Sequence, residues 1–179
     1  MSNSNKTRVF VALYSRGGVT SATQSHELHY ARFHWAIWTE PKGSTGMGSC
    51  YQVLKGDSFV NVPGSGGWRF DYSRTANYTR SNAMLGRIMV GKIPSNVSPD
   101  HVSAIVSRIP LPRDNVAPVE NCVSWTMAAL QELQRHSWVD DFNVQGFMDH
   151  ALDRASCWYR DNYNLRRNVK ENYTERKFP

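Results

Sequence analysis

The residues with the clearest chemical potential are Asn121 and Cys122, at the predicted start of a helix over residues 122–135. Asn121 is a favourable N-cap, because its side-chain oxygen accepts from the free N–H groups of the first helical turn. Three apolar residues then share one face of this helix: Val123, Met127 and Leu130. A helix start favours an anion and lowers the pKa of a thiol. Cys122 is therefore a candidate nucleophile, and the alternative is a small buried apolar residue, as free cysteines often are.

His34 is the candidate partner of this thiol. It lies in the segment Phe33–Trp38, whose aromatic and β-branched residues predict a strand. A thiolate nucleophile needs a base within hydrogen-bond reach, usually a histidine, and the two residues need not be close in sequence. With His34 as the base and the backbone N–H of Cys122 as an oxyanion donor, the pair would work through a thioester. This chemistry serves a thiol hydrolase and an acyltransferase equally well.

The order of the pair, a histidine on a strand followed by a cysteine at a helix start, resembles the circularly permuted papain-like enzymes. These include the PPPDE-type peptidases and the lecithin:retinol acyltransferase group of NlpC-type enzymes. A closer resemblance is to an uncharacterised family of small fungal proteins, and four segments carry it: residues 12–18, 34–37, 87–92 and 121–125. The resemblance implies a permuted papain-like fold with a Cys–His pair, and it implies no substrate.

A third group should orient the imidazole, and Gln52 is the candidate. It lies on a strand predicted over residues 49–54, which we expect to pair as a hairpin with the His34 strand. In the similar fungal sequences and in the retinol acyltransferase group a histidine tends to stand at this position, so Gln52 departs from that pattern. Papain-like sites do accept an amide in this role, and the alternative is a surface glutamine.

Tyr14, Arg16 and Asn121 are candidates for substrate binding or for the oxyanion hole. The Tyr14 hydroxyl would donate to the oxyanion if the first strand lies alongside, and the alternative is a core tyrosine whose hydroxyl is satisfied. Arg16 stands beside two glycines, where it would bind a carboxylate or a phosphate. The alternative for Arg16 is a solvated side chain.

The sequence offers no reason to expect a metal or a cofactor. His26, His29 and His34 lie close in sequence, but no carboxylate or thiol completes a ligand set. The glycine-rich run at residues 64–67 lacks the lysine and the Ser/Thr of a phosphate loop. We therefore expect neither a metal site nor a cofactor.

Length and composition predict one globular domain. The chain has 179 residues, of which 40% are hydrophobic and 20% charged. Three widely spaced cysteines argue against a disulfide framework. The N-terminus has no apolar run and no segment approaches transmembrane length, so we expect a cytoplasmic protein without a membrane span. Its oligomeric state stays open.

The net charge of +6 permits an anionic partner, for example an RNA. The C-terminal segment contributes six cations: Arg160, Arg166, Arg167, Lys170, Arg176 and Lys177. Three functional classes remain. The first is an acyl-transfer enzyme, hydrolase or transferase, acting on a small-molecule or peptide acyl substrate. The second uses aminoacyl-tRNA as the donor to make a peptide bond, as fungal cyclodipeptide-forming enzymes do. The third is a non-catalytic binding domain.

The expected fold is α+β, with an antiparallel sheet of about five strands and helices packed against it. The predicted strands cover residues 8–14, 33–38, 49–54, 68–72 and 85–93. The predicted helices cover residues 99–107, 122–135 and 140 to about 164, the last one broken near Gly146 or continuous. Around a single domain at 8–165 we expect a disordered lead at 1–7 and a basic tail at 166–179.

Overall fold

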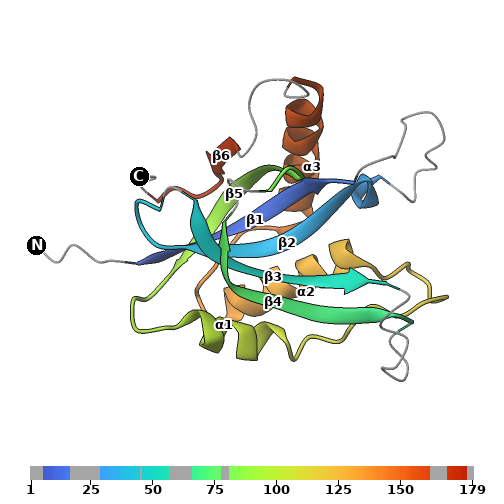
Figure 1. Ribbon diagram of the computed structural model, residues 1–179, viewed down its shortest axis with the longest axis horizontal. Coiled ribbons are helices and arrows are strands. Elements are labelled where there is room, and N and C mark those ends of the chain that lie inside the picture. The colour runs from blue at the N-terminus through green and yellow to red at the C-terminus, as the bar shows by residue number, and fades with distance from the viewer. Residues whose placement is uncertain are drawn as a thin grey trace, which may run out of the picture.

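The computed structural model describes residues 6–16, 29–44, 46–56, 66–77, 81–161 and 169–176. The elements in chain order are β1 (Thr7–Ser15), a 3₁₀ helix (Tyr30–Arg32), β2 (Phe33–Glu40), β3 (Met47–Lys55), β4 (Trp68–Asn77), β5 (Met84–Ile93), α1 (Pro99–Val106), α2 (Cys122–Arg135), α3 (Val144–Asp161) and β6 (Val169–Asn172). The strands form one sheet in the order β4-β3-β2-β1-β5-β6, shown in Figure 1. Among the strands of the described residues, only β5 and β6 pair in parallel. The fold is α+β, as the sequence predicts.

The three helices pack on one face of the sheet (Figure 1). Alternate side chains of each strand therefore point toward the helices and away from them. Val11 and Leu13 of β1 belong to the large core shared with the helices, as do Trp35 and Ile37 of β2. The intervening side chains belong to a second buried cluster on the other face: Phe10, Ala12, Ala36, Trp38, Cys50, Met84 and Met89. Both faces of the central strands are therefore buried.

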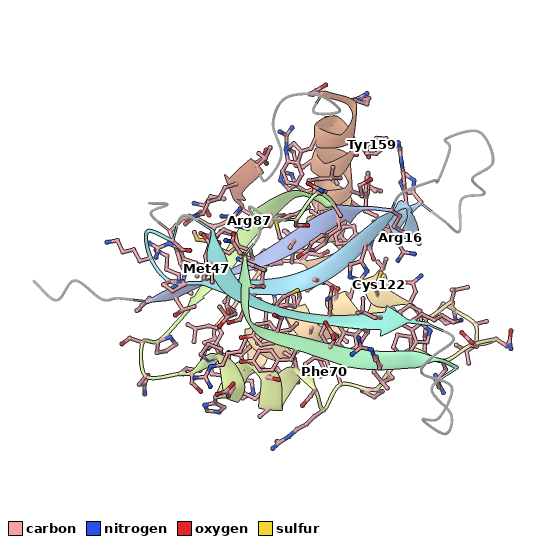
Figure 2. All side chains as sticks on the ribbon, in the orientation of Figure 1. Arg16, Met47, Phe70, Arg87, Cys122 and Tyr159 are labelled. Carbon is pink, nitrogen blue, oxygen red and sulfur yellow. The ribbon has the colours of Figure 1, made fainter. Side chains whose placement is uncertain are left out.

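Strands β2 and β3 pair over only a few residues, and this positions the candidate site. The ladder joins only Ile37–Thr39 to Ser49–Tyr51. His34, near the start of β2, and Gln52, after the paired part of β3, lie beyond it. Figure 1 shows the two strands diverging at this end, and Figure 2 labels Cys122 there. A side chain from α2 can therefore reach between the strands.

Most elements agree with the sequence analysis. The helix at 122–135 has the predicted bounds, and Ser98 caps α1 by accepting from the His101 N–H. The segment expected over residues 140–164 is α3, and it runs through Gly146 without a break. β2 and β3 form the expected antiparallel hairpin.

The C-terminal segment differs from the expectation of a separate basic tail. Val169–Asn172 forms β6, which pairs in parallel with Gly86–Met89 of β5. Glu171 of this strand accepts from Arg154 of α3 at 2.7 Å. β6 therefore belongs to the domain, and this corrects the predicted boundary at residue 165. The predicted lead is also one residue shorter, because β1 begins at Thr7, and its residues 1–5 lie outside the described part of the chain.

Candidate active site

Cys122 is the first residue of α2, where a capping box fixes the backbone. The Val123 N–H donates to Asn121 Oδ1 at 2.8 Å, and the Asn121 N–H donates to Ser124 Oγ at 2.8 Å. The Cys122 N–H is a further first-turn donor, and none of the hydrogen bonds among the described residues uses it. The amide predicted as an oxyanion donor is thus present next to the sulfur. Asn121 itself acts as the helix cap.

The Cys122 thiol is surrounded by groups that favour its charged form. Arg16 Nη2 donates to the sulfur at 3.1 Å, and both residues are labelled in Figure 2. Burial raises the pKa of this thiol, since Cys122 has no exposed surface. A hydrogen bond and the charge of His34, the charge of Arg16 and a backbone hydrogen bond of Trp35 together outweigh burial and lower the pKa. The structure thus brings Cys122, His34 and Arg16 together.

Gln52 sets the tautomer of His34. The His34 Nε2 atom lies 2.8 Å from Gln52 Oε1. An amide oxygen only accepts, so Nε2 carries the proton in this hydrogen bond. The other ring nitrogen, Nδ1, is then left for the hydrogen bond with Cys122. The structure therefore places Gln52 where a third catalytic residue is expected.

Asp71 and Arg69 extend this chain of contacts, and the sequence analysis missed both. Gln52 Nε2 donates to Asp71 Oδ2 at 3.0 Å, and Arg69 Nη1 pairs with Asp71 Oδ1 at 2.8 Å. A carboxylate accepts only, so Asp71 holds the Gln52 amide with its oxygen toward His34. Gln52 and Asp71 are direct partners in the β3–β4 ladder. The period-2 alternation puts Arg69 and Asp71 on one face, but finding them requires the register between the strands.

Tyr14 lies near His34, but its hydroxyl contacts the sulfur of Cys50 and not that of Cys122. The two rings are 5.7 Å apart between centroids, and the Tyr14 hydroxyl lies 3.8 Å from the sulfur of Cys50. Burial and the neighbouring Cys50 raise the pKa of Tyr14. This placement matches the alternative that the sequence allowed, a core tyrosine with its hydroxyl satisfied.

The other two cysteines lie in different surroundings. Burial raises the pKa of the Cys50 thiol to about 12. Cys157 is half-buried on α3, where its sulfur accepts from Arg160 Nη2 at 3.3 Å. Neither thiol has a histidine partner among the residues that the structure describes. Cys122 is therefore the cysteine in the chemically activating position.

The structure also bears on the expected partners and metals. Within the described ranges, no three His, Cys, Asp or Glu side chains are grouped to hold a metal, and His26 lies outside them. No helix in the described part of the chain is long and apolar enough to cross a membrane. Two cations of the predicted basic tail are ion-paired, Lys170 with Glu40 at 2.5 Å and Arg176 with Asp140 at 2.6 Å. Arg166, Arg167 and Lys177 are not among the described residues.

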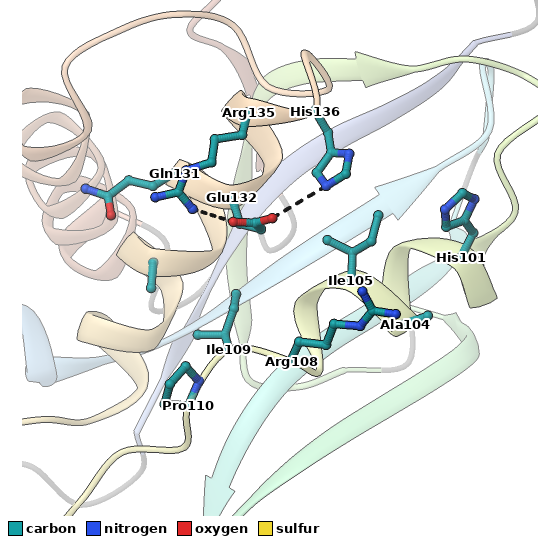
Figure 3. Close-up of a pocket in the computed structure, with 11 residues that line it drawn as sticks. His101, Ala104, Ile105, Arg108, Ile109, Pro110, Gln131, Glu132, Arg135 and His136 are labelled. Carbon is teal, nitrogen blue, oxygen red and sulfur yellow. Dashed lines mark hydrogen bonds and ion pairs between the residues drawn. The ribbon is translucent and has the colours of Figure 1, made fainter.

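A groove of about 490 Å³ lies between α1 and α2, away from the thiol (Figure 3). Ile105, Arg108 and Glu132 are among its lining residues. Glu132 forms ion pairs with Arg135 and with His136, the latter at 3.5 Å. Glu132 and Arg135 belong to the C-terminal half of α2 and His136 is its C-cap, whereas Cys122 is the first residue of the helix. The groove is therefore separate from the candidate active site.

Comparisons with known proteins give one match. The sequence model of a family of unknown function (DUF6914) matches residues 6–175, which include every residue of the candidate site. No curated protein and no solved structure matches the chain.

Proposed function

We propose that this chain, which belongs to the DUF6914 family, is a cysteine-nucleophile acyl-transfer enzyme with Cys122 as the nucleophile and His34 as the base. The observation that carries the proposal is that His34 contacts Gln52 and the Cys122 thiol at once. Gln52 accepts from Nε2, and this leaves Nδ1 for the thiol. A buried structural cysteine has no need of such an arrangement.

The proposal relates the protein to the circularly permuted papain-like enzymes. Three features support this relation. The histidine strand β2 precedes the cysteine helix α2 in the chain, and the cysteine is the first residue of that helix. Helix α2 packs on β2 and β3, the strands that carry His34 and Gln52. An amide side chain occupies the third position, as papain-like sites accept.

In the first step the Cys122 thiolate attacks the carbonyl carbon of the acyl donor. A C–S bond forms and the carbonyl π electrons move to oxygen, where the Cys122 N–H at the start of α2 stabilises the negative charge. Collapse of this intermediate breaks the bond to the leaving group, which takes its proton from the His34 imidazolium. The product is a thioester on Cys122.

In the second step neutral His34 removes a proton from water, an amine or a hydroxyl. That acceptor attacks the thioester carbon, the C–S bond breaks, and the sulfur leaves as the thiolate beside the reformed imidazolium. Hydrolysis and transfer share this step and differ only in the acceptor. Because the resting thiol has no exposed surface, the acceptor must reach a site from which water is largely excluded.

Thiol labelling tests the proposal. We expect iodoacetamide at pH 6.5 to modify Cys122 well before Cys50 or Cys157, because the Cys122 pKa is lowered and that of Cys50 is raised to about 12. Peptide mapping by mass spectrometry measures the order, and Cys122→Ser is the control that should lose the fast phase only. Equal labelling of the three thiols, or a Cys122 that resists the reagent, would support the non-catalytic binding domain instead.

A further inference from the structure

Arg16 is an exposed arginine, and its guanidinium contacts the sulfur atom of Cys122. Its Nη2 donates to Cys122 at 3.1 Å, and no carboxylate pairs with it within the described ranges. The comparison with two other arginines of the sheet is informative. Arg69 pairs with Asp71 and Arg87 with Glu40, each at 2.8 Å. Among the described residues no acid balances the Arg16 guanidinium, which lies directly beside the candidate nucleophile.

This guanidinium belongs to an exposed residue and contacts the buried sulfur of the nucleophile. Cys122 has no exposed surface, whereas Arg16 is exposed. A guanidinium has five N–H donors, and the contact with the sulfur uses one of them. A molecule that approaches the sulfur from the side of Arg16 contacts this guanidinium, and the remaining donors form a fork that matches a carboxylate.

We propose that Arg16 selects acyl donors that carry a carboxylate close to the reacting carbonyl. The proposal rests on the proposed function and adds the class of substrate. The carboxylate binds the Arg16 donors that the sulfur leaves free, so that the substrate carbonyl is held close to the nucleophile. His34 and the backbone of Trp35 stabilise the thiolate together with Arg16.

The geometry limits where the carboxylate lies on the substrate. Arg16 Nη2 is 3.1 Å from the sulfur, and a charge-assisted hydrogen bond from the same group adds about 2.8 Å. A carboxylate oxygen held by Arg16 is thus within about 6 Å of the sulfur, which places it a few bonds from the carbon under attack. Donors whose anionic group is remote from the carbonyl do not meet this requirement.

A pair of alkylating reagents tests this selection without knowledge of the natural donor. Iodoacetate and iodoacetamide have the same reacting carbon, and only iodoacetate carries a carboxylate next to it. In both reactions the thiolate forms a C–S bond while the C–I bond breaks and iodide leaves with its electron pair. Rate constants are measured for Cys122 over a range of pH, and the limiting values for the fully formed thiolate are compared. This removes any effect of a variant on the thiol pKa.

We expect the ratio of the iodoacetate to the iodoacetamide rate constant to fall about tenfold in Arg16→Gln, the scale of one charge-assisted hydrogen bond. Arg16→Lys should retain part of the preference. Arg108→Gln, which removes the same charge from the distant α1–α2 groove, should leave the ratio unchanged. A ratio that is the same in wild type and Arg16→Gln overturns the proposal.

The two reagents also separate this proposal from the proposed function. Slow iodoacetamide labelling of Cys122 in the wild type would contradict the nucleophile itself. Fast iodoacetamide labelling with an unchanged ratio would contradict only the carboxylate selection, and would leave Arg16 as a stabiliser of the thiolate. Because peptide mapping follows each thiol, a misfolded Arg16→Gln protein shows itself by rapid labelling of Cys50, which is buried in the folded protein.

Discussion

Gln52 of β3 and Asp71 of β4 are paired neighbours on adjacent strands, and the Gln52 amide donates to the Asp71 carboxylate at 3.0 Å. The same amide accepts from His34 through its oxygen at 2.8 Å. Without Asp71 the amide is free to rotate, and its nitrogen would then face the imidazole and favour the wrong tautomer. Asp71 is therefore a positioning residue, which acts on the thiol through Gln52 and His34.

The first prediction concerns this positioning. Asp71→Ala should lower the rate of Cys122 alkylation at pH 6.5 several-fold and move the pH profile upward, because His34 is no longer held with Nδ1 toward the sulfur. Ser73→Ala, on the same strand and face, is the matched control. Peptide mapping of samples quenched at successive times gives the rates. A purely structural role for Asp71 would lower the melting temperature and leave the pH profile of the folded protein in place.

The second prediction concerns the base. The Cys122 pKa is lowered in the wild type, so its thiolate is present at a pH where an ordinary thiol is protonated, and alkylation slows only as the pH falls through that lowered pKa. His34→Ala removes the largest of the lowering contributions, so the midpoint of the pH profile should move to higher pH. At a fixed pH below the midpoint, labelling should slow about tenfold for each pH unit by which the midpoint rises.

Activity gives an independent readout of His34. Once a substrate is known, His34→Ala should reduce turnover by about 10²–10⁴-fold, the usual contribution of a general base. His101→Ala, on the exposed surface of α1, is the control. Retention of more than about a tenth of the rate would mean that another group serves as the base.

Local patterns were sufficient to predict strands β1 to β5 and the start of helix α2. Asn121 as the cap of a helix at 122–135 follows from side-chain chemistry within one turn, and the Phe33–Trp38 strand follows from its composition. The Cys–His pair required one further assumption, that the helix packs on the strand with the histidine. The contact of Cys122 with His34 agrees with that assumption.

The features that were missed depend on contacts between distant segments. Asp71 can be assigned only when the β3–β4 register is known. β6 is short and polar, and its four residues are held by pairing with β5 and by the Lys170–Glu40 and Arg154–Glu171 ion pairs. The sequence pattern of residues 169–172 does not indicate these distant partners, so local analysis assigns the segment to a tail.

The third prediction concerns the buried charges on the sheet face away from the helices. Glu40 has no exposed surface and accepts from Arg87 at 2.8 Å, from Trp38 at 2.9 Å and from Lys170 of β6 at 2.5 Å. Glu40→Gln should lower the free energy of unfolding by about 3–5 kcal/mol, because it leaves the buried Arg87 charge unbalanced. Urea denaturation measures the loss. Lys55→Gln, which breaks an exposed pair with Asp114, should have little effect.

The fourth prediction separates the structural role of Asn121 from a chemical one. Asn121 Oδ1 accepts from the Val123 N–H, so Asn121→Ala should cost about 1 kcal/mol of stability through the lost cap. Asn121→Ser keeps an acceptor and should keep both the stability and the fast labelling of Cys122. A loss of labelling in Asn121→Ser, with the stability intact, would instead show that the amide group itself contributes to the site.

The last prediction concerns the acyl-enzyme. If Cys122 works through a thioester, incubation with a suitable donor should add the mass of the acyl group to the intact protein. Neutral hydroxylamine should remove that mass, because it cleaves thioesters. The adduct should be absent in Cys122→Ser. It should persist in Cys50→Ala, because the wild-type Cys50 thiol is buried and its pKa is raised to about 12. The donors should include small thioesters with and without a carboxylate near the carbonyl, and aminoacyl-tRNA with and without prior nuclease treatment.

The identity of the productive donor decides between the remaining classes of acyl transfer on Cys122. An adduct from small donors that survives nuclease supports acyl transfer without RNA. An adduct that forms only with intact aminoacyl-tRNA supports the RNA-dependent alternative, in which binding should also weaken steeply with salt as phosphate counterions are released. If no donor in either class modifies Cys122 while iodoacetamide still does, the acyl donor lies outside both classes, and if iodoacetamide also fails, the catalytic role of Cys122 is contradicted.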